Sequence, residues 1–443
     1  MAPPHSAAAR LPTGSGILGG VSSPNNPLDV AIAGGGVAGL EALLGLRAVA
    51  GDRVRLTLIA PDPDFSYRPL AVAEPFGLGR AHRVPLTRFV EDAGAELVDD
   101  GVVGVDDASR RVRLAGGGSR SFDVLLLAPG GRAVAGVAGA TTWWPGGDPD
   151  IYGGLLRDID EGYTKRLAIV VPAGAVWPLP AYELALMTAG EAQAMGHDDV
   201  KVTVVTPERV PLLLFGEEAS KALAEELQWA GVDVITGAVA RPEHGGLLLE
   251  PAGDRLEVER SFAVPRIVGP ALEGVPGDDE GFILAGDDAR VEGCERTWAA
   301  GDGVASPVKF GGLATHQARR AVAAIARLAG VEDAPDPGEP VIHGRLLVGQ
   351  RTRRLRGRGD AEGAPLWWPH GKVAGEYLPR WLADHGVAAP VSQAPPEDGV
   401  TIQQPVRAMR AEAGYLAELA RQFSSNDPAI AALGRRMREM RSR

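Results

Sequence analysis

The chain has 443 residues, of which 45% are apolar and 23% are charged, and its 57 acidic and 45 basic residues give a net charge of -12. This length corresponds to about three domains and excludes a mini-protein. No uncharged apolar stretch reaches the roughly 18 residues of a membrane-spanning helix, and the acidic balance argues against a duplex nucleic-acid ligand, which needs a basic face. We expect a globular protein with small-molecule or protein partners and no nucleic acid.

Residues 1–28 contain many Pro, Gly, Ser and Ala and no sustained apolar run, which predicts a disordered tail. Arg10 is the one charge in this segment and is followed by glycines, a pattern unlike a secretory signal, which has a basic start and an apolar centre. We expect a cytoplasmic protein and leave peripheral attachment to a membrane open.

From Asp29 the pattern changes to a strand, a glycine cluster and a helix, DVAIAGGGVAGLEALLGLRAV, followed by the strand VRLTLIA. A second unit of this kind lies at 167–206, and the second strands of the two units end alike, in LIAPD and VVTPE. This similarity indicates duplication of one nucleotide-binding plan. Near residue 295 the chain returns to a strand, a loop and a long helix, so the second unit is inserted into the first.

We therefore predict an α/β fold with two interleaved Rossmann-like domains of three layers each and a C-terminal cap or interface domain. A linker rich in Pro and Asp, VEDAPDPGEP at 331–340, precedes the last domain. The predicted segments are the tail at 1–28, the first dinucleotide domain at 29–160 and 271–332, the second at 161–270, and the C-terminal domain at 333–443.

The glycine cluster matches the motif GxGxxG between a strand and a helix, which is the context that makes this motif informative. Glycines let the backbone approach a pyrophosphate, whose charge the helix N-terminus stabilises. The candidate residues are Gly34, Gly36, Val37, Ala38 and Gly39. Glu41, two residues further on, is expected either to reach this loop or to face solvent, and Asp62, just after the second strand, is the candidate for ribose binding.

Four segments in this order resemble the two-dinucleotide-domain flavoproteins, most of all the type II NADH dehydrogenases and the sulfide:quinone oxidoreductases. They are GGGVAGLEA, FSYRPLAVAEPF at 65–76, DVLLLAPGG at 123–131 and TWAAGD at 297–302, and the resemblance covers about residues 29–330. It implies that the first domain binds FAD without a covalent link and that the second is of the NAD(P) type. The residues that would surround the FAD are Tyr67, Arg68, Pro69, Gly130, Gly301 and Asp302, the last at the ribityl chain.

The segment from Lys309 to His316 leads into the long helix, and the free N–H groups at the helix start would suit the negatively charged edge of a reduced flavin. Leu313 and Ala314 lie in the first turn and are candidates for flavin contact. Lys309 is either a catalytic cation or a surface lysine. His316 is either a proton relay or a packed helix histidine.

The second unit departs from the NAD(P)H pattern. When Glu183 is aligned with Glu41, the three glycine positions fall on Val176, Pro178 and Ala181. Proline lacks the backbone N–H group that a pyrophosphate would use. NAD(P)H therefore stays one candidate donor among others.

Glu183 matches the family's helix glutamate near the flavin and is the candidate general base. Its aromatic neighbours Trp177 and Tyr182 belong either to the core or to a donor site. Cys294 is the only cysteine, so no cysteine pair can carry electrons, and sulfide oxidation by the route known for the resembled family is excluded. We expect a structural role for Cys294.

The C-terminal domain carries a basic stretch from Arg345 to Arg358, an aromatic cluster at 367–372 and an Arg-rich end. The arginines form either a solvated face or an attachment site for an anionic membrane surface or an acidic protein. The two tryptophans of the cluster either anchor this domain on the flavin domain or form a flat quinone slot. A homodimer is also left open.

We predict an FAD-dependent oxidoreductase that passes two electrons from a small donor, NAD(P)H or another reductant, through non-covalent FAD to a quinone-like or other acceptor, without a cysteine-pair relay. Two alternatives stay open: a soluble flavin reductase for a protein electron carrier, and an inactive flavoprotein that serves as a binding module. We expect no metal site.

Overall fold

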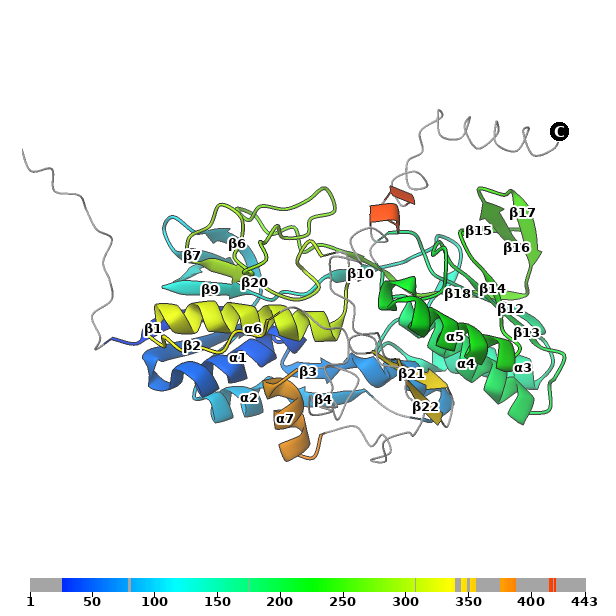
Figure 1. Ribbon diagram of the computed structural model, residues 1–443, viewed down its shortest axis with the longest axis horizontal. Helices are drawn as coiled ribbons and strands as arrows, with labels where there is room; N and C mark the ends of the chain where they lie inside the picture. Colours follow the sequence, from blue (N-terminus) through cyan, green and yellow to red (C-terminus); the bar gives the residue numbers. More distant parts are fainter. Residues whose placement is uncertain are drawn as a thin grey trace, which may run out of the picture.

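The computed structural model has two lobes, each built on a parallel sheet (Figure 1). The residues that it describes are 26–78, 81–174, 176–306, 308–338, 344–348, 351–355, 375–387, 414–416 and 418–419. Most of the predicted tail, the aromatic cluster at 367–372 and the Arg-rich end lie outside these residues. No helix within the described ranges is long and apolar enough to cross a membrane.

The first sheet combines strands from distant parts of the chain. Its central strand β1 (Leu28–Ala33) lies between β2 (Val54–Ala60) and β9 (Val124–Leu127), and all neighbouring strands are parallel. The strands are nearly continuous apolar runs, such as VLLL in β9, because a parallel sheet is covered on both faces. The outer strands are β5 (Glu96–Asp99), next to β2, and β20 (Thr297–Ala299), next to β9.

Helices α1 (Val37–Ala50) and α6 (Gly311–Leu328) pack side by side on one face of this sheet, and a three-stranded meander packs on the other (Figure 1). A two-stranded ribbon and a short helix follow β2. The bounds of these elements are β6 (Val102–Asp106), β7 (Arg111–Leu114) and β8 (Ser119–Ser121) in the meander, and η1 (Gly51–Arg53), β3 (Asp64–Tyr67), η2 (Arg68–Phe76), β4 (His82–Pro85) and α2 (Leu86–Ala93) elsewhere.

The second sheet repeats the plan of the first. Its strand order β11-β18-β12-β13-β14 corresponds to β20-β9-β1-β2-β5, and all its pairings are parallel. The repeat confirms the predicted α/β class with two Rossmann-like units. The strands are β11 (Thr141–Thr142), β12 (Arg166–Val170), β13 (Lys201–Val205), β14 (Asp233–Ile235) and β18 (Arg260–Ala263).

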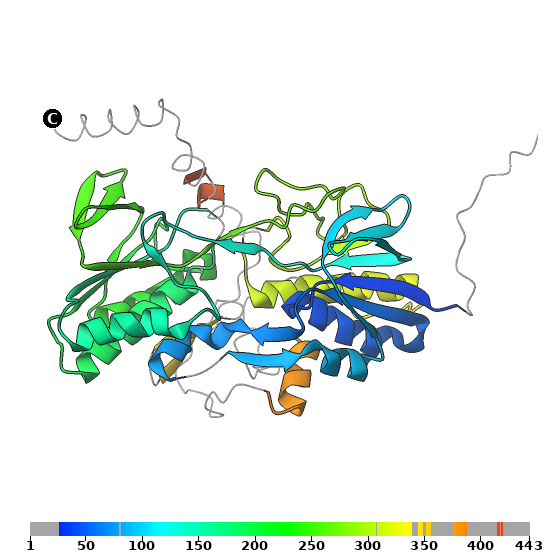
Figure 2. The same ribbon diagram turned by 180° about the vertical axis from the view of Figure 1, so that it is seen from behind.

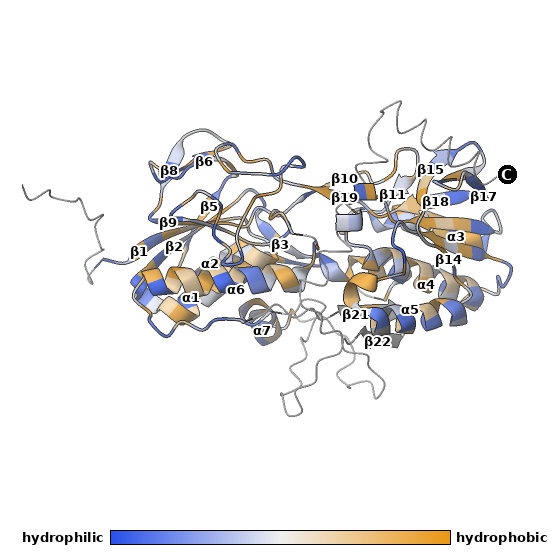
Figure 3. Ribbon diagram, turned by 45° about the horizontal axis from the view of Figure 1, so that its top comes forward, coloured by the Kyte–Doolittle hydropathy of each residue, from blue (hydrophilic) through white to orange (hydrophobic). Residues whose placement is uncertain are grey.

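Helices and a second meander surround this sheet. Figure 3 shows apolar residues concentrated where the helices meet the strands, and buried apolar clusters lie in both lobes. The elements are α3 (Pro149–Asp160), α4 (Leu179–Ala194), η3 (Leu213–Phe215), α5 (Glu217–Trp229), β15 (Val239–Glu243), β16 (Gly246–Glu250) and β17 (Asp254–Glu257).

Two short strands join the lobes. β10 (Arg132–Val134) leads from the first lobe to the second, β19 (Arg266–Val268) leads back, and the two pair antiparallel (Figure 2). After the second crossing, the hairpin of β21 (Gly344–Val348) and β22 (Arg351–Leu355) packs against α4, and α7 (Tyr377–Asp384) packs against α1. The C-terminal region therefore contacts both lobes.

Candidate functional site

The carboxyl edge of the first sheet gathers most of the predicted cofactor-binding residues. Parallel strands end at a common edge, so the loops after β1, β2, β9 and β20 lie together. The loop after β1 contains the glycine cluster, and the loop after β20 contains Gly301 and Asp302. Asp62 follows β2 as an exposed side chain, and Gly130 follows β9.

The three glycines of the motif have different surroundings. Gly34 has a φ of +122°, and a Cβ atom there would lie 2.0 Å from the carbonyl oxygen of Ala128. A Cβ atom at Gly39 would lie 1.9 Å from the carbonyl oxygen of Gly34, so both positions require glycine. A Cβ atom at Gly36 meets nothing within 4 Å. The loop is therefore tightly packed on its inner side and open at Gly36.

The start of α1 offers backbone donors beside this open side. The first hydrogen bond of the helix runs from the Leu40 amide to the Gly36 carbonyl oxygen (2.9 Å), so the amides of Val37, Ala38 and Gly39 lie ahead of the helical ladder. Gly36 has no side chain to cap them, and the first turn contains no acidic residue. This donor set suits a phosphate anion, which a helix N-terminus stabilises.

The starts of α1 and α6 converge on Gly301. A Cβ atom at Gly301 would lie 3.1 Å from the Cβ of Ala38 and 3.8 Å from that of Ala314. The Gly301 amide donates to Oε1 of Gln317 at 2.8 Å, and Leu313 is buried in the first turn of α6. Two helix N-termini therefore meet at the edge where the sequence predicts the cofactor.

Asp302 lies half-buried near two cations. Burial raises the pKa of its carboxyl, while Lys309, Arg68 and a hydrogen bond from the Phe310 amide act in the opposite direction. A carboxylate with these neighbours is held in place and keeps acceptor capacity for a hydroxyl group.

The segment predicted to run along the flavin borders Asp302. Tyr67 ends β3 as a buried side chain, and η2 begins directly after it with Arg68 and Pro69. Arg68 is exposed and close enough to Asp302 to influence its carboxyl. Contact of these residues with a flavin stays a prediction.

Lys309 is buried, so it is not the surface lysine that one interpretation of the sequence expected. Its side chain is 3% exposed, and Nζ donates to the carbonyl oxygen of Val304 at 2.5 Å. Nζ also lies 3.5 Å from the centre of the Phe282 ring, a cation–π contact. Burial lowers the pKa of this amine to about 8, and the nearby Asp302 limits the decrease.

His316 is buried on α6, and its surroundings keep the imidazole neutral at pH 7. Burial and the positive charges of Arg319 and Arg320 lower its pKa to about 4. The ring makes a hydrogen bond with the Gly338 backbone, and its Nε2 has no hydrogen-bond partner in the part of the chain that the structure describes. These contacts are those of a packed histidine, and the relay role stays a prediction.

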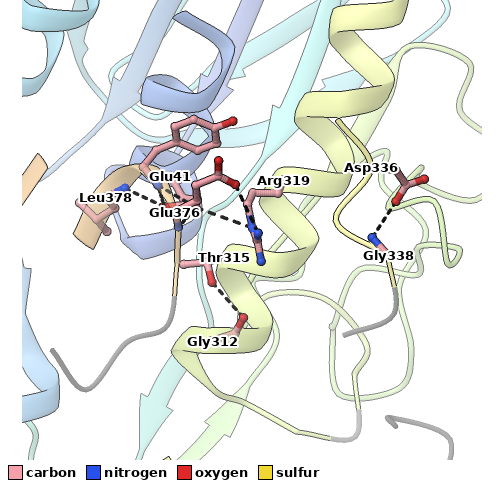
Figure 4. Close-up of polar contacts among 9 residues, drawn as sticks. Glu41, Gly312, Thr315, Arg319, Asp336, Gly338, Glu376 and Leu378 are labelled. Carbon is pink, nitrogen blue, oxygen red and sulfur yellow. Dashed lines mark hydrogen bonds and ion pairs between the residues drawn. The ribbon is translucent and has the colours of Figure 1, made fainter. Parts of the chain in front are cut away.

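Glu41 binds the start of α7, so the expectation that it reaches the phosphate loop or faces solvent is wrong. Its fully buried carboxylate accepts hydrogen bonds from the amides of Glu376, Tyr377 and Leu378 at 2.7–3.2 Å (Figure 4). Nε of Arg319 lies 3.9 Å from the same carboxylate. Burial raises the pKa of Glu41, and these partners oppose the increase. The glutamate therefore fixes the C-terminal helix to α1.

The start of α4, the equivalent of α1 in the second lobe, offers fewer donors. Pro178 and Pro180 have no N–H group, and the Ala181 amide already donates to the carbonyl oxygen of Pro178 at 3.0 Å. Of these first positions, the Leu179 amide alone is left for a ligand. A pyrophosphate would find one donor here, whereas α1 offers three.

The acidic residue that follows β13 is turned into the core. Glu208 is 3% exposed; its Oε2 accepts hydrogen bonds from the hydroxyls of Tyr182 (2.5 Å) and Thr206 (3.0 Å), and its Oε1 accepts one from the Leu212 amide (3.0 Å). Burial and the Glu208 charge raise the pKa of Tyr182. Glu208 was not among the predicted site residues, although its place in VVTPE matches that of Asp62 in LIAPD.

Aromatic side chains join the loop before α4 to the start of α6. Trp177 stacks on Phe310 with ring centres 4.8 Å apart and an interplanar angle of 28°, and the ring of Phe215 lies 5.3 Å from that of Trp177. Glu183 is fully buried on α4, which packs against η2 and β21. Its action as a general base stays a prediction.

Cys294 is half-buried beside the apolar cluster on the meander face of the first sheet. Burial and the charge of Asp107 raise the pKa of its thiol, which makes it a poor nucleophile. Within the described residues, no group of three or more His, Cys, Asp or Glu side chains is placed to hold a metal ion.

The family model of the pyridine nucleotide-disulphide oxidoreductases matches residues 28–327. The sulfide-quinone reductase of Aquifex aeolicus is 27% identical over 266 residues, which are 56% of this chain and 61% of that protein. An NADH dehydrogenase-like protein of Mycobacterium tuberculosis is 29% identical over 294 residues, which are 62% of this chain and 72% of that protein. The chain thus spans about three fifths of the Aquifex reductase.

Solved structures share the two-lobed fold. The sulfide:quinone oxidoreductase from Aquifex aeolicus has a TM-score of 0.65 at 20% identity and covers 74% of this chain and 83% of its own. A ferredoxin reductase from Rhodopseudomonas palustris has a TM-score of 0.55 at 20% identity, and the match covers 75% of this chain and 84% of the reductase. At these identities the similarity concerns the fold alone.

Proposed function

The chain belongs to the pyridine nucleotide-disulphide oxidoreductase family, and we propose that it is an FAD-dependent enzyme that passes two electrons from a small donor to a quinone-like acceptor. The observation that carries this proposal is the open position at Gly36, which lies between two glycines that cannot be replaced and beside the backbone donors of α1. Such a loop suits the pyrophosphate of a dinucleotide.

Different residues at the carboxyl edge of the first sheet would bind different parts of FAD. The amides of Val37, Ala38 and Gly39 would bind the pyrophosphate, Asp62 the adenosine ribose, and Asp302 the ribityl hydroxyls. These contacts are all non-covalent. The bound FAD supplies a centre that accepts and releases two electrons.

Two further features serve the reaction. The N-terminus of α6, with Leu313 and Ala314 in its first turn, would stabilise negative charge at the cofactor. Lys309 holds a proton on Nζ near Asp302 and adds a positive charge there. In the complete reaction the donor loses two electrons, and the quinone gains these two electrons and two protons, taken from the donor and from solvent, to form a quinol.

The names of the relatives support a quinone as acceptor and leave the donor open. One relative is a sulfide-quinone reductase and another is NADH dehydrogenase-like. Because Cys294 is the only cysteine, electrons would pass to the flavin without a cysteine pair. A quinone acceptor would bring the chain to a membrane surface, which co-sedimentation with liposomes tests.

A protein electron carrier is the second candidate acceptor. The structural neighbours include the ferredoxin reductase and a putidaredoxin reductase in complex with putidaredoxin, the latter with a TM-score of 0.51 at 18% identity. The basic stretch from Arg345 to Arg358 would suit an acidic carrier. Reduction rates that fall steeply with ionic strength would favour this candidate.

Anaerobic spectroscopy of the purified protein tests the proposal. We expect the protein to retain FAD, to be reduced by dithionite and to be reoxidised rapidly by a soluble quinone. A colourless protein would contradict FAD binding. A flavin that dithionite reduces and that no quinone or ferredoxin reoxidises would instead indicate an inactive binding module.

A further inference from the structure

The carboxyl edges of the two sheets place an acidic residue at the same position. Asp62 follows β2 and Glu208 follows β13, strands that occupy equivalent places in the two sheets. In a dinucleotide fold, an acid near this position binds the ribose hydroxyls. Asp62 is exposed and available for that purpose, whereas Glu208 is buried.

The Glu208 carboxylate already has hydrogen-bond donors within the protein. Both of its oxygens accept hydrogen bonds, from the hydroxyls of Tyr182 and Thr206 and from the Leu212 amide. The Tyr182 hydroxyl gives this acid the type of hydrogen bond that a ribose hydroxyl would give. A nucleotide ribose would have to displace these donors before it could bind Glu208, and a buried carboxylate that loses its donors is costly.

Tyr415, from the C-terminal part of the chain, lies beside the residue that follows Glu208. The guanidinium of Arg209, the residue directly after Glu208, lies 4.4 Å from the ring centre of Tyr415. Tyr415 belongs to the short helical stretch at 414–416, drawn in red in Figure 1 above the second lobe. A cation that stacks on an aromatic ring is less available for a phosphate.

We infer that the second sheet is closed to NAD(P)H by the chain's own Tyr182, Glu208 and Tyr415, and that the electron donor is a molecule without a pyridine dinucleotide. Three independent features support this inference: the prolines at the start of α4, the buried acid after β13, and the contact of Tyr415 with Arg209 beside that acid. The part of the inference that concerns the donor depends on the proposed function. The closure of the edge does not.

The test measures nucleotide binding to the full-length, FAD-loaded protein by anaerobic calorimetry. The probes are NADH, NADPH and ADP-ribose; the last contains the ribose and pyrophosphate but no nicotinamide, so it reports binding without any redox step. We expect no saturable binding of any probe up to about 1 mM. Saturable binding of any of them with a Kd below about 1 mM would overturn the inference.

A pair of variants tests whether Tyr182 holds the network. Tyr182→Phe removes the hydroxyl that faces Glu208, and Tyr152→Phe removes a buried hydroxyl of the same lobe that bonds the neutral Thr188 at 2.8 Å. We expect the first to lower Tm by roughly 2–6 °C and the second to lower it less, because the first leaves a buried charge short of a donor. Equal shifts, or no shift for Tyr182→Phe, would contradict the role of Tyr182.

The FAD content of the same samples separates the two proposals. A preparation that holds no FAD would contradict the proposed function but not the closure of the second sheet to nucleotides. A preparation that retains FAD and binds ADP-ribose fails the inference alone.

Discussion

The two carboxyl edges have the same strand order but opposite surroundings. At the first edge, Gly36 faces open space, three helix amides precede the helical ladder and Asp62 is exposed. At the second, two prolines start the helix and Glu208 is buried under Tyr182. The Rossmann-like fold thus provides a crevice at the carboxyl edge of each sheet, and a few residues at that edge determine whether a nucleotide can bind.

The largest expected effect comes from the glycine that faces open space. Gly36→Val should reduce FAD affinity at least 100-fold, about 3 kcal/mol, because the side chain occupies the space that the pyrophosphate needs. The fold should persist, since Gly36 has a φ of -87° that valine tolerates. FAD titration and thermal unfolding of the FAD-free protein measure both quantities. Pro178→Val, at the equivalent position of the second lobe, is the control and should leave FAD affinity unchanged.

The next effect concerns Glu41, the buried glutamate of α1 that binds the start of α7. Glu41→Ala should lower the free energy of unfolding by about 3 kcal/mol, because three amides at the start of α7 lose their buried acceptor. Hydrogen exchange of residues 375–387 should accelerate in the same variant. Asp92→Asn provides the control: Asp92 is 47% exposed and also contacts α7, through Trp381 and His385, and should cost less than about 1 kcal/mol. Equal costs would show that Glu41 does not anchor the helix.

Acid should destabilise the first lobe through His316. Its folded-state pKa of about 4 lies below the ordinary value of 6.5, so the unfolded chain takes up a proton over this range and the folded chain does not. The free energy of unfolding should therefore fall by about 3 kcal/mol between pH 6.5 and 4. His316→Leu should reduce this slope. An unchanged slope would mean that His316 is accessible to protons in the folded state.

The smallest effects are expected from replacing the acidic residues that follow β2 and β13, Asp62 and Glu208. Asp62→Ala should weaken FAD binding by about 1 kcal/mol and leave unfolding of the FAD-free protein unchanged, because the side chain is exposed. Glu208→Ala should do the reverse: it should destabilise the protein by about 2 kcal/mol, since Tyr182 and Leu212 lose their acceptor, and should leave FAD binding unchanged. The same response in both variants would remove the difference between the edges.

Much of the fold follows from local patterns in the sequence. Apolar runs predict the strands, the glycine cluster predicts the turn between β1 and α1, and the return near residue 295 predicts that β20 joins the first sheet. Site residues that directly follow a strand were predictable for the same reason, because the carboxyl ends of parallel strands share one edge.

The remaining features depend on contacts between residues far apart in the chain. Glu41 caps a helix that begins more than 300 residues later, and no local pattern indicates that partner. Lys309 is buried because the carbonyl of Val304 and the ring of Phe282 surround its amine. The position of Glu208 could have been predicted, because LIAPD and VVTPE align it with Asp62. Its burial could not, because that depends on the hydrogen bond from Tyr182.

The central claim is that the carboxyl edge of the first sheet is open to a dinucleotide and that of the second sheet is closed. The most direct test mixes the FAD-loaded protein with NADH or NADPH in an anaerobic stopped-flow instrument and follows the visible absorbance of the flavin. The account predicts that neither nucleotide bleaches the flavin, while dithionite does and a soluble quinone restores the colour. Rapid bleaching by NADH or NADPH would contradict the account, because it would require a pyridine nucleotide to bind where Tyr182 and Glu208 hold the second edge closed.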